Sequence, residues 1–181
     1  MPVFATQNEP RQSAIDAASL TGPFRDFYDY WRSKRADRPV PLRADLAVLA
    51  DLPRLAPQMV VVEALSDGGF RFRLVGSALV KTMRRDLTNR RIDASVYGDG
   101  AAGIVAALRS VISSGTPWVN RHKVGWDGAA ASAAEMLICP VSTDGRAIDQ
   151  VVGLTRFSPA AGMGARRTAG VGLEESLQVR D

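Results

Sequence analysis

The segment that most constrains the fold begins at Phe70, where apolar and basic side chains alternate. The order from there is Phe-Arg-Phe-Arg-Leu-Val. Successive side chains of a β-strand point to opposite faces of a sheet, so this pattern predicts a half-buried strand with Phe70, Phe72 and Leu74 inward. A run of three valines at 60–62 precedes it, and an Asp-Gly-Gly turn at 67–69 lies between the two. The sequence therefore predicts a β-hairpin.

A long helical segment and three further strand-like segments follow the hairpin. Residues 100–114 carry apolar side chains at helical spacing, and Asp99 stands where it can cap the first turn. Residues 77–97 contain only short helical patterns. The β-branched and aromatic content of the remainder predicts strands at 117–124, 132–142 and 148–157. This order predicts an α+β fold with a five-stranded antiparallel sheet and helices on one face.

Four aromatic side chains near the N-terminus form one stripe of a predicted helix. They are spaced by three, four and seven residues, at Phe24, Phe27, Tyr28 and Trp31. A stripe of this size cannot stay exposed without a risk of aggregation. It can pack on the chain's own sheet, serve as a dimer or docking surface that covers the sheet of a second subunit, or do both. The second interpretation predicts a homodimer.

The uneven distribution of large apolar side chains divides the chain into four segments. The first twenty or so residues show no sustained periodicity, and the last twenty or so are rich in Gly, Ala and Arg. Segments that cannot bury apolar surface tend to stay flexible. We therefore expect a flexible N-terminal segment over 1–22, a helical extension over 23–56, the α+β domain over 57–158 and a flexible tail over 159–181.

The net charge of +4 raises the question of nucleic-acid binding. The basic residues are scattered, and no aromatic side chain interleaves the densest group at 84–91, so nucleic acid is not the expected partner. The start of the chain lacks the pattern of a secretory signal. The apolar run at 59–62 stops at Glu63, far short of the roughly 20 residues that cross a bilayer. We expect a cytoplasmic protein without a membrane partner.

One predicted strand carries polar side chains on an otherwise apolar face. Trp118, Asn120, His122, Val124 and Trp126 stand at alternate positions and so share a face. Two tryptophans there indicate that the face points inward, where Asn120 and His122 would be the few polar groups of a small-ligand pocket. Alternatively, the face is exposed at its end, or His122 hydrogen-bonds a backbone carbonyl. The predicted pocket residues are Phe72, Leu74, Leu108, Trp118, Asn120, His122 and Met136.

Few residues point to catalysis. His122 is the only histidine and has no neighbouring Cys or His, so neither a metal nor a haem site is expected. Neither a phosphate-binding loop nor a Gly-x-Ser-x-Gly elbow is present. Cys139, the single cysteine, lies in an apolar strand as a buried small hydrophobe does. We predict no catalytic residue, and the sequence itself requires no cofactor.

Two alternatives stay open. The first is a small α+β barrel enzyme acting on a hydrophobic substrate, with Glu135 or His122 as the base. The more ordinary role for Glu135 and Glu63 is an outer position, paired across strands with arginines such as Arg71 or Arg73. The second alternative is an interaction-only protein with a filled core and no ligand.

Several short motifs are spread over residues 24–158. They are Tyr-Trp-Arg-Ser-Lys-Arg at 30–35, Pro-Leu-Arg-Ala-Asp at 41–45, Asp-Leu-Pro-Arg-Leu at 51–55, Phe-Arg-Phe-Arg-Leu-Val-Gly-Ser at 70–77, Arg-Asp-Leu-Thr at 85–88 and Cys-Pro-Val-Ser-Thr-Asp-Gly at 139–145. Together they resemble the stand-alone bacterial PAS proteins, which carry a Trp-containing lead helix and an Arg-Leu-Val-Gly strand. Arg84 and Asn89 stand where the resemblance would place glycines.

The resemblance implies a PAS-like domain over 57–158 that acts in signal transduction without a fused effector domain. It implies a sensory or regulatory module that binds a small apolar ligand or a signalling protein partner.

Overall fold

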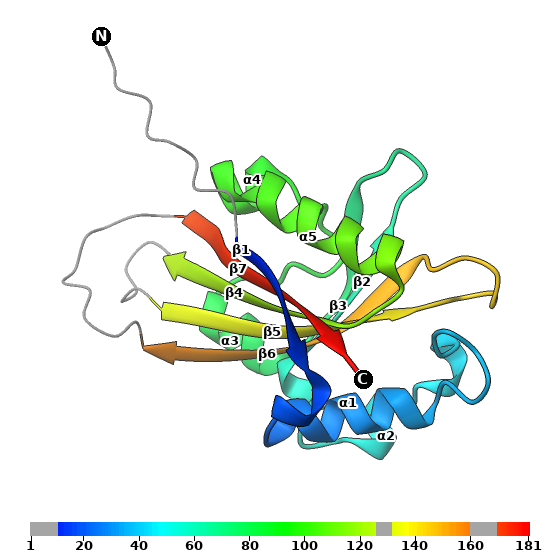
Figure 1. Cartoon of the computed structure of the whole chain (residues 1–181). Coiled ribbons are helices and arrows are strands. Elements are labelled where there is room, and N and C mark those ends of the chain that lie inside the picture. The colour runs from blue at the N-terminus through cyan, green and yellow to red at the C-terminus, as the bar shows by residue number, and fades with distance from the viewer. Residues whose placement is uncertain (1–10, 126–131, 160–169) are drawn as a thin grey trace, which may run out of the picture.

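A single seven-stranded sheet organises the chain in the computed structural model, which describes residues 11–125, 132–159 and 170–181 (Figure 1). Its strand order is β1-β7-β4-β5-β6-β2-β3. The strands are β1 (Arg11–Asp16), β2 (Met59–Ala64), β3 (Phe70–Val75), β4 (Trp118–Gly125), β5 (Ser132–Val141), β6 (Gln150–Pro159) and β7 (Gly170–Arg180).

The five predicted strands are β2 to β6, and each pairs antiparallel with its neighbour. The α+β prediction is therefore confirmed, but the number of strands is wrong. β7 adds to β4 in antiparallel pairing, and β1 adds to β7 in parallel pairing. Both extra strands fall in segments that the sequence predicts to be flexible.

β7 is ordered because β4 would otherwise be an open edge with unpaired backbone groups. Leu177 and Val179 of β7 are buried, and they alternate with side chains on the other face. Two large apolar residues are a weak signal for a strand, and the pairing partner is more than forty residues away in the sequence. Gly170–Arg180 thus forms a strand within the segment expected to be a flexible tail, and Arg11–Asp16 forms one within the expected flexible N-terminal segment.

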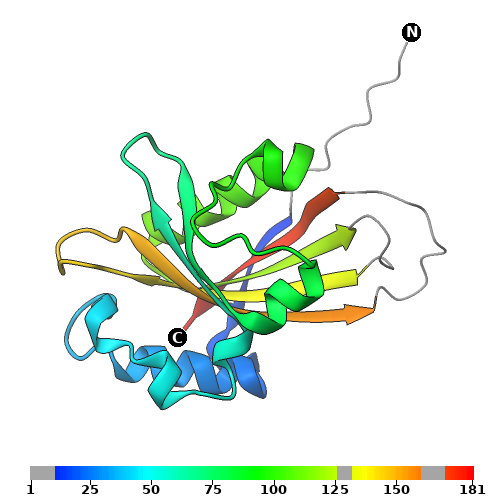
Figure 2. The ribbon, with the colours of Figure 1, turned by 180° about the vertical axis from the view of Figure 1, so that it is seen from behind.

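Helices cover both faces of the sheet: those that follow the first hairpin lie on one face, as the sequence predicts for the domain, and the N-terminal helices lie on the other. Figures 1 and 2 show α1 and α2 on one side and α5 on the other. The helices are α1 (Pro23–Ser33), α2 (Val48–Asp51), α3 (Ser77–Met83), α4 (Ala94–Tyr97) and α5 (Ala101–Ser114). Single 3₁₀ turns lie at Ala17–Ser19, Arg43–Asp45, Ala56–Gln58 and Gly98–Gly100.

The aromatic stripe of α1 packs on the chain's own sheet. All four side chains are buried, and the Trp31 Nε1–H donates to the Pro140 carbonyl oxygen over 2.8 Å. The Tyr28 hydroxyl donates to the carboxylate of Asp181 at the end of the chain. Phe24, Phe27, Tyr28 and Trp31 are therefore not an exposed dimer or docking surface, because their own sheet already buries them.

The long helix α5 lies over the face that carries Phe70 and Phe72. Leu108 and Val111 of α5 belong to the same buried cluster as these two side chains. The helix ends at Gly115, whose left-handed φ of 65° lets its N–H bond to the Val111 carbonyl. Asp99 does not cap it, because this residue lies inside the preceding 3₁₀ turn.

A β-bulge in β3 reverses the side-chain alternation on which the sequence prediction rests. Val62 pairs with Phe72 and Val61 pairs with Leu74, so the backbone of Arg73 is skipped in the pairing with β2. One extra residue moves every later side chain to the other face. Leu74 accordingly packs with the α1 side of the core, and Val75 takes the α5 side.

None of the helices in the described part of the chain has the length and apolar character needed to cross a membrane.

Candidate functional site

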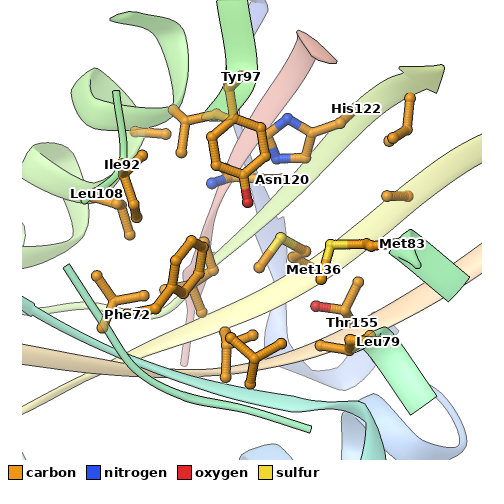
Figure 3. A pocket seen from close by; sticks show the side chains of 18 of the residues that line it. Phe72, Leu79, Met83, Ile92, Tyr97, Leu108, Asn120, His122, Met136 and Thr155 are labelled. Atoms are coloured by element: carbon orange, nitrogen blue, oxygen red, sulfur yellow. The ribbon is translucent and has the colours of Figure 1, made fainter. Parts of the chain in front are cut away.

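A cavity of about 80 Å³ lies between the sheet and the helices α3, α4 and α5 (Figure 3). Strands β2 to β6 supply its floor, and the three helices with the segment before α4 supply its roof. Most of its lining side chains are aliphatic, aromatic or methionine. The polar lining residues are Tyr97, Asn120, His122 and Thr155.

Most of the predicted pocket residues line this cavity. They are Phe72, Leu108, Asn120, His122 and Met136. Leu74 and Trp118 do not. The bulge at Arg73 directs Leu74 to the opposite face of the sheet, where it lines a second cavity of about 200 Å³ against the segment that contains α2.

Trp118 is buried in the same cluster as Phe72 and Leu108, at the start of β4 and outside the cavity. Its Nε1–H donates to the Ser114 hydroxyl over 3.0 Å. This bond ties the first residue of β4 to the last residue of α5, which is a structural role. Trp126, the second tryptophan of the predicted face, lies outside the described residues.

His122 is the most unusual polar group of the site. It is 4% exposed, and its Nδ1 has no hydrogen-bond partner among the described residues. Burial lowers the pKa of the imidazole to about 4, because the charged form would lose its hydration without gaining an opposite charge. His122 is therefore neutral at pH 7, with one nitrogen available as an acceptor and the other as a donor.

Asn120 lies two residues before His122 on the same face of β4. Its side-chain oxygen accepts a 2.6 Å hydrogen bond from the Ser176 hydroxyl of β7, and both residues are buried. β7 therefore contributes to the site indirectly, by holding one of its polar side chains.

Thr155 supplies a second unpartnered polar atom. It is 5% exposed, and its hydroxyl has no partner among the described residues. The sequence prediction missed it, although Val151, Thr155 and Phe157 stand at alternate positions of one strand and so share a face. That period of two was the signal that could have identified Thr155.

Tyr97 reaches the cavity from the end of α4. Its ring lies 6.4 Å from the Phe72 ring, measured between centroids, and Figure 3 shows its hydroxyl end directed into the cavity. Burial raises its pKa, so the phenol stays neutral. The Asp93 carboxylate fixes the start of α4 by accepting from the Ser95 N–H. A four-residue helix gives no periodic sequence signal, so Tyr97 could not be predicted.

The two strand carboxylates lie away from the cavity. Glu135 shares the opposite face of β5 with Leu137 and forms ion pairs with Arg121 and Arg156. Glu63 pairs with Arg71 and Arg73, as the sequence predicts. Glu135 consequently cannot act as a base inside the cavity.

Cys139 lies outside the cavity. The thiol is fully buried on the α1 side of the sheet, and burial raises its pKa well above the usual value. Within the described ranges, no cluster of three or more His, Cys, Asp or Glu residues could hold a metal ion.

Comparison with known families decides the class of the protein. The sequence model of the PAS domain matches residues 19–156, which is most of the chain. The chain belongs to the PAS domain family. The match includes α1 and the segment up to β2 as well as the predicted α+β domain.

Solved structures similar to this PAS domain include light-oxygen-voltage proteins. The LOV protein of Rhodobacter sphaeroides has a TM-score of 0.45 and 14% identity, over 57% of this chain and 60% of that chain. A light-oxygen-voltage domain described with a flavin analogue has a TM-score of 0.45 and 10% identity, over 63% of this chain and 86% of that chain. The match thus spans less than two thirds of the Rhodobacter protein. A search of curated proteins gives no match.

The crossover of this PAS domain, residues 84–93 between α3 and α4, has left-handed backbone geometry at two positions that are not glycine. Arg84 ends α3 with a φ of 53°, and Asn89 has a φ of 63°. Both lie in the left-handed region, which costs little for Asn and more for Arg. From there the chain runs along β3, where the Asn89 N–H donates to the Phe72 carbonyl oxygen over 2.8 Å.

Proposed function

We propose that this PAS domain is a sensory module whose cavity binds a small, mostly apolar molecule. The observation that carries the proposal is the combination of an apolar cavity with two buried polar atoms, on His122 and Thr155, that no described residue satisfies. Small-ligand sites are commonly built this way, from apolar walls and a few polar groups. A buried polar group without a partner costs about 1–3 kcal/mol, which a bound molecule can recover.

The volume limits the size of the ligand. A water needs about 10–15 Å³ of such volume, so a cavity of about 80 Å³ holds several waters. An apolar cavity of about 150 Å³ is known to bind benzene. Two of the lining residues, Met83 and Met136, have flexible side chains that can repack around a somewhat larger guest.

A ligand can act as a signal only if two arrangements of the domain bind it with different affinity. The roof of the cavity is the part best suited to change, because α3, α4 and the crossover between them are short elements with exposed side chains. We expect the changed surface to be recognised by a signalling protein. Homodimerisation stays a prediction, although it can no longer be argued from the aromatic stripe, which is buried within one chain.

Native mass spectrometry of freshly purified protein tests the proposal. Ala107 lines the cavity, whereas Ala106 is exposed on the same helix, so Ala107→Leu fills the site and Ala106→Leu is its matched control. We expect a retained small molecule, or binding of small apolar fragments, in the wild-type chain and in Ala106→Leu. Ala107→Leu should lose it.

Retention of the same mass by Ala107→Leu would contradict the proposal, as would a failure of the wild-type chain to take up any fragment. The second result would favour the interaction-only alternative. The enzyme alternative would have to use His122 and Tyr97 as its acid–base pair, because these are the titratable side chains among the described lining residues.

A further inference from the structure

The two unpartnered polar atoms of the cavity lie at separate places. His122 is on β4 opposite Ala134 of β5, whereas Thr155 is on β6 opposite Met136 of β5. β5 therefore lies between the two residues, and their partners on β5 are two residues apart. Figure 3 shows the two side chains apart. A single small group on a ligand can satisfy one of them but not both.

His122 is the more demanding of the two. A threonine hydroxyl can rotate to find a weak partner, whereas the ring of His122 is held in the floor between Asn120 and Val124 on the same face of β4. The Asn120 oxygen is already engaged by Ser176. His122 lines the cavity, so a molecule bound there can supply a partner for Nδ1.

A neutral imidazole nitrogen either accepts or donates, depending on the tautomer. A hydroxyl group can do both, so it satisfies Nδ1 in either state. A charged group is disfavoured, because the described lining contains no Asp, Glu, Lys or Arg to pair with it.

We propose that the ligand is a small, uncharged alcohol or phenol whose hydroxyl group hydrogen-bonds His122 Nδ1 while its hydrocarbon part fills the apolar space toward Phe72 and Leu108. This inference rests on the proposed function, since it assigns the chemistry of the ligand in the same cavity. His122 is then the residue that selects among molecules of similar size, and the apolar walls supply the binding surface.

Calorimetric titration with a matched set of probes tests the assignment. Phenol and toluene have the same shape and differ in a hydroxyl against a methyl group, and benzoate adds a charge. We expect the wild-type chain to bind phenol about tenfold more tightly than toluene, as one recovered buried hydrogen bond predicts, and to bind benzoate not measurably.

Three variants identify the hydrogen-bonding residue. His122→Phe and His122→Leu remove the nitrogen, and either one that folds should bind toluene more tightly than phenol, because the phenol hydroxyl would then be buried without a partner. Thr155→Val removes the other unpartnered atom at nearly constant shape and should keep the preference for phenol.

The outcomes separate this inference from the proposed function. Equal binding of toluene and phenol by the wild-type chain would overturn the inference and leave the ligand-binding cavity standing. Loss of the preference in Thr155→Val but not in the His122 variants would also overturn it, as would benzoate binding as tight as that of phenol. If neither neutral probe binds, the proposed function itself fails.

Discussion

Acidification should destabilise this protein in a way that one residue, His122, makes measurable. It is the only histidine of the chain, and burial lowers its pKa from 6.5 to about 4. In the unfolded chain the imidazole regains its usual pKa, so between these two values the unfolded state binds a proton that the folded state does not. The contribution of the neutral, buried His122 to the free energy of unfolding is therefore fully present above about pH 6.5 and is lost as the pH falls toward 4.

The size of the effect follows from the shift. Each pKa unit corresponds to about 1.4 kcal/mol. At pH 5, about 1.5 units below the unfolded pKa of 6.5, the unfolded imidazole is protonated and the folded one is still mostly neutral. The free energy of unfolding should therefore fall by about 2 kcal/mol between pH 7 and pH 5. This is a large part of the roughly 5–15 kcal/mol that a typical domain has.

Urea unfolding at several pH values measures this loss, and His122→Phe is the control. The variant keeps a buried ring but cannot take up a proton, so its stability should change much less over the same interval. The difference between the two proteins cancels the contributions of carboxylates that both contain. Equal pH dependence in wild type and variant would refute the view that His122 is buried and neutral in the cavity wall.

Three substitutions test the packing around the site. Trp31→Phe removes the donor to the Pro140 carbonyl, and urea unfolding should show a loss of about 1–3 kcal/mol; an unchanged stability would mean that α1 does not pack there. Gly76→Ala would place a Cβ 2.3 Å from the Pro57 carbonyl oxygen, so a loss of about 1–3 kcal/mol is expected in the same assay, and a neutral result would contradict this close approach. Arg84→Gly should instead raise stability by about 0.5–1 kcal/mol, because it relieves a left-handed φ, and a loss would show that the arginine makes a compensating contact.

The hairpin, the long helix and the three later strands were predictable because each carries a strong local pattern. Phe72 and Leu108 were placed correctly in the cavity for the same reason, since a period of two and a helical stripe each fix a face. Asn120 and His122 followed from their alternation on one strand. For these residues, the pattern of neighbours in the sequence is enough to determine the face toward which the side chain points.

The rest depended on contacts between distant segments. The bulge at Arg73 arises from how β3 pairs with β2, and it moved Leu74 to the opposite face. β7 is a strand because β4 offers it an edge, not because of its own composition. Tyr97 lies on a single turn whose position is set by the crossover, so no pattern in the sequence marks it as part of the cavity.

The central claim, that the α5 side of the sheet holds the ligand, is tested most directly by NMR of methionine methyl groups. Met83 and Met136 line the proposed site, whereas Met59 lines the cavity on the opposite face and is an internal control. On addition of phenol or toluene, the methyl signals of Met83 and Met136 should shift in a saturable way and that of Met59 should stay in place. A shift of Met59 alone, or no shift of Met83 and Met136 with either probe, would contradict the account.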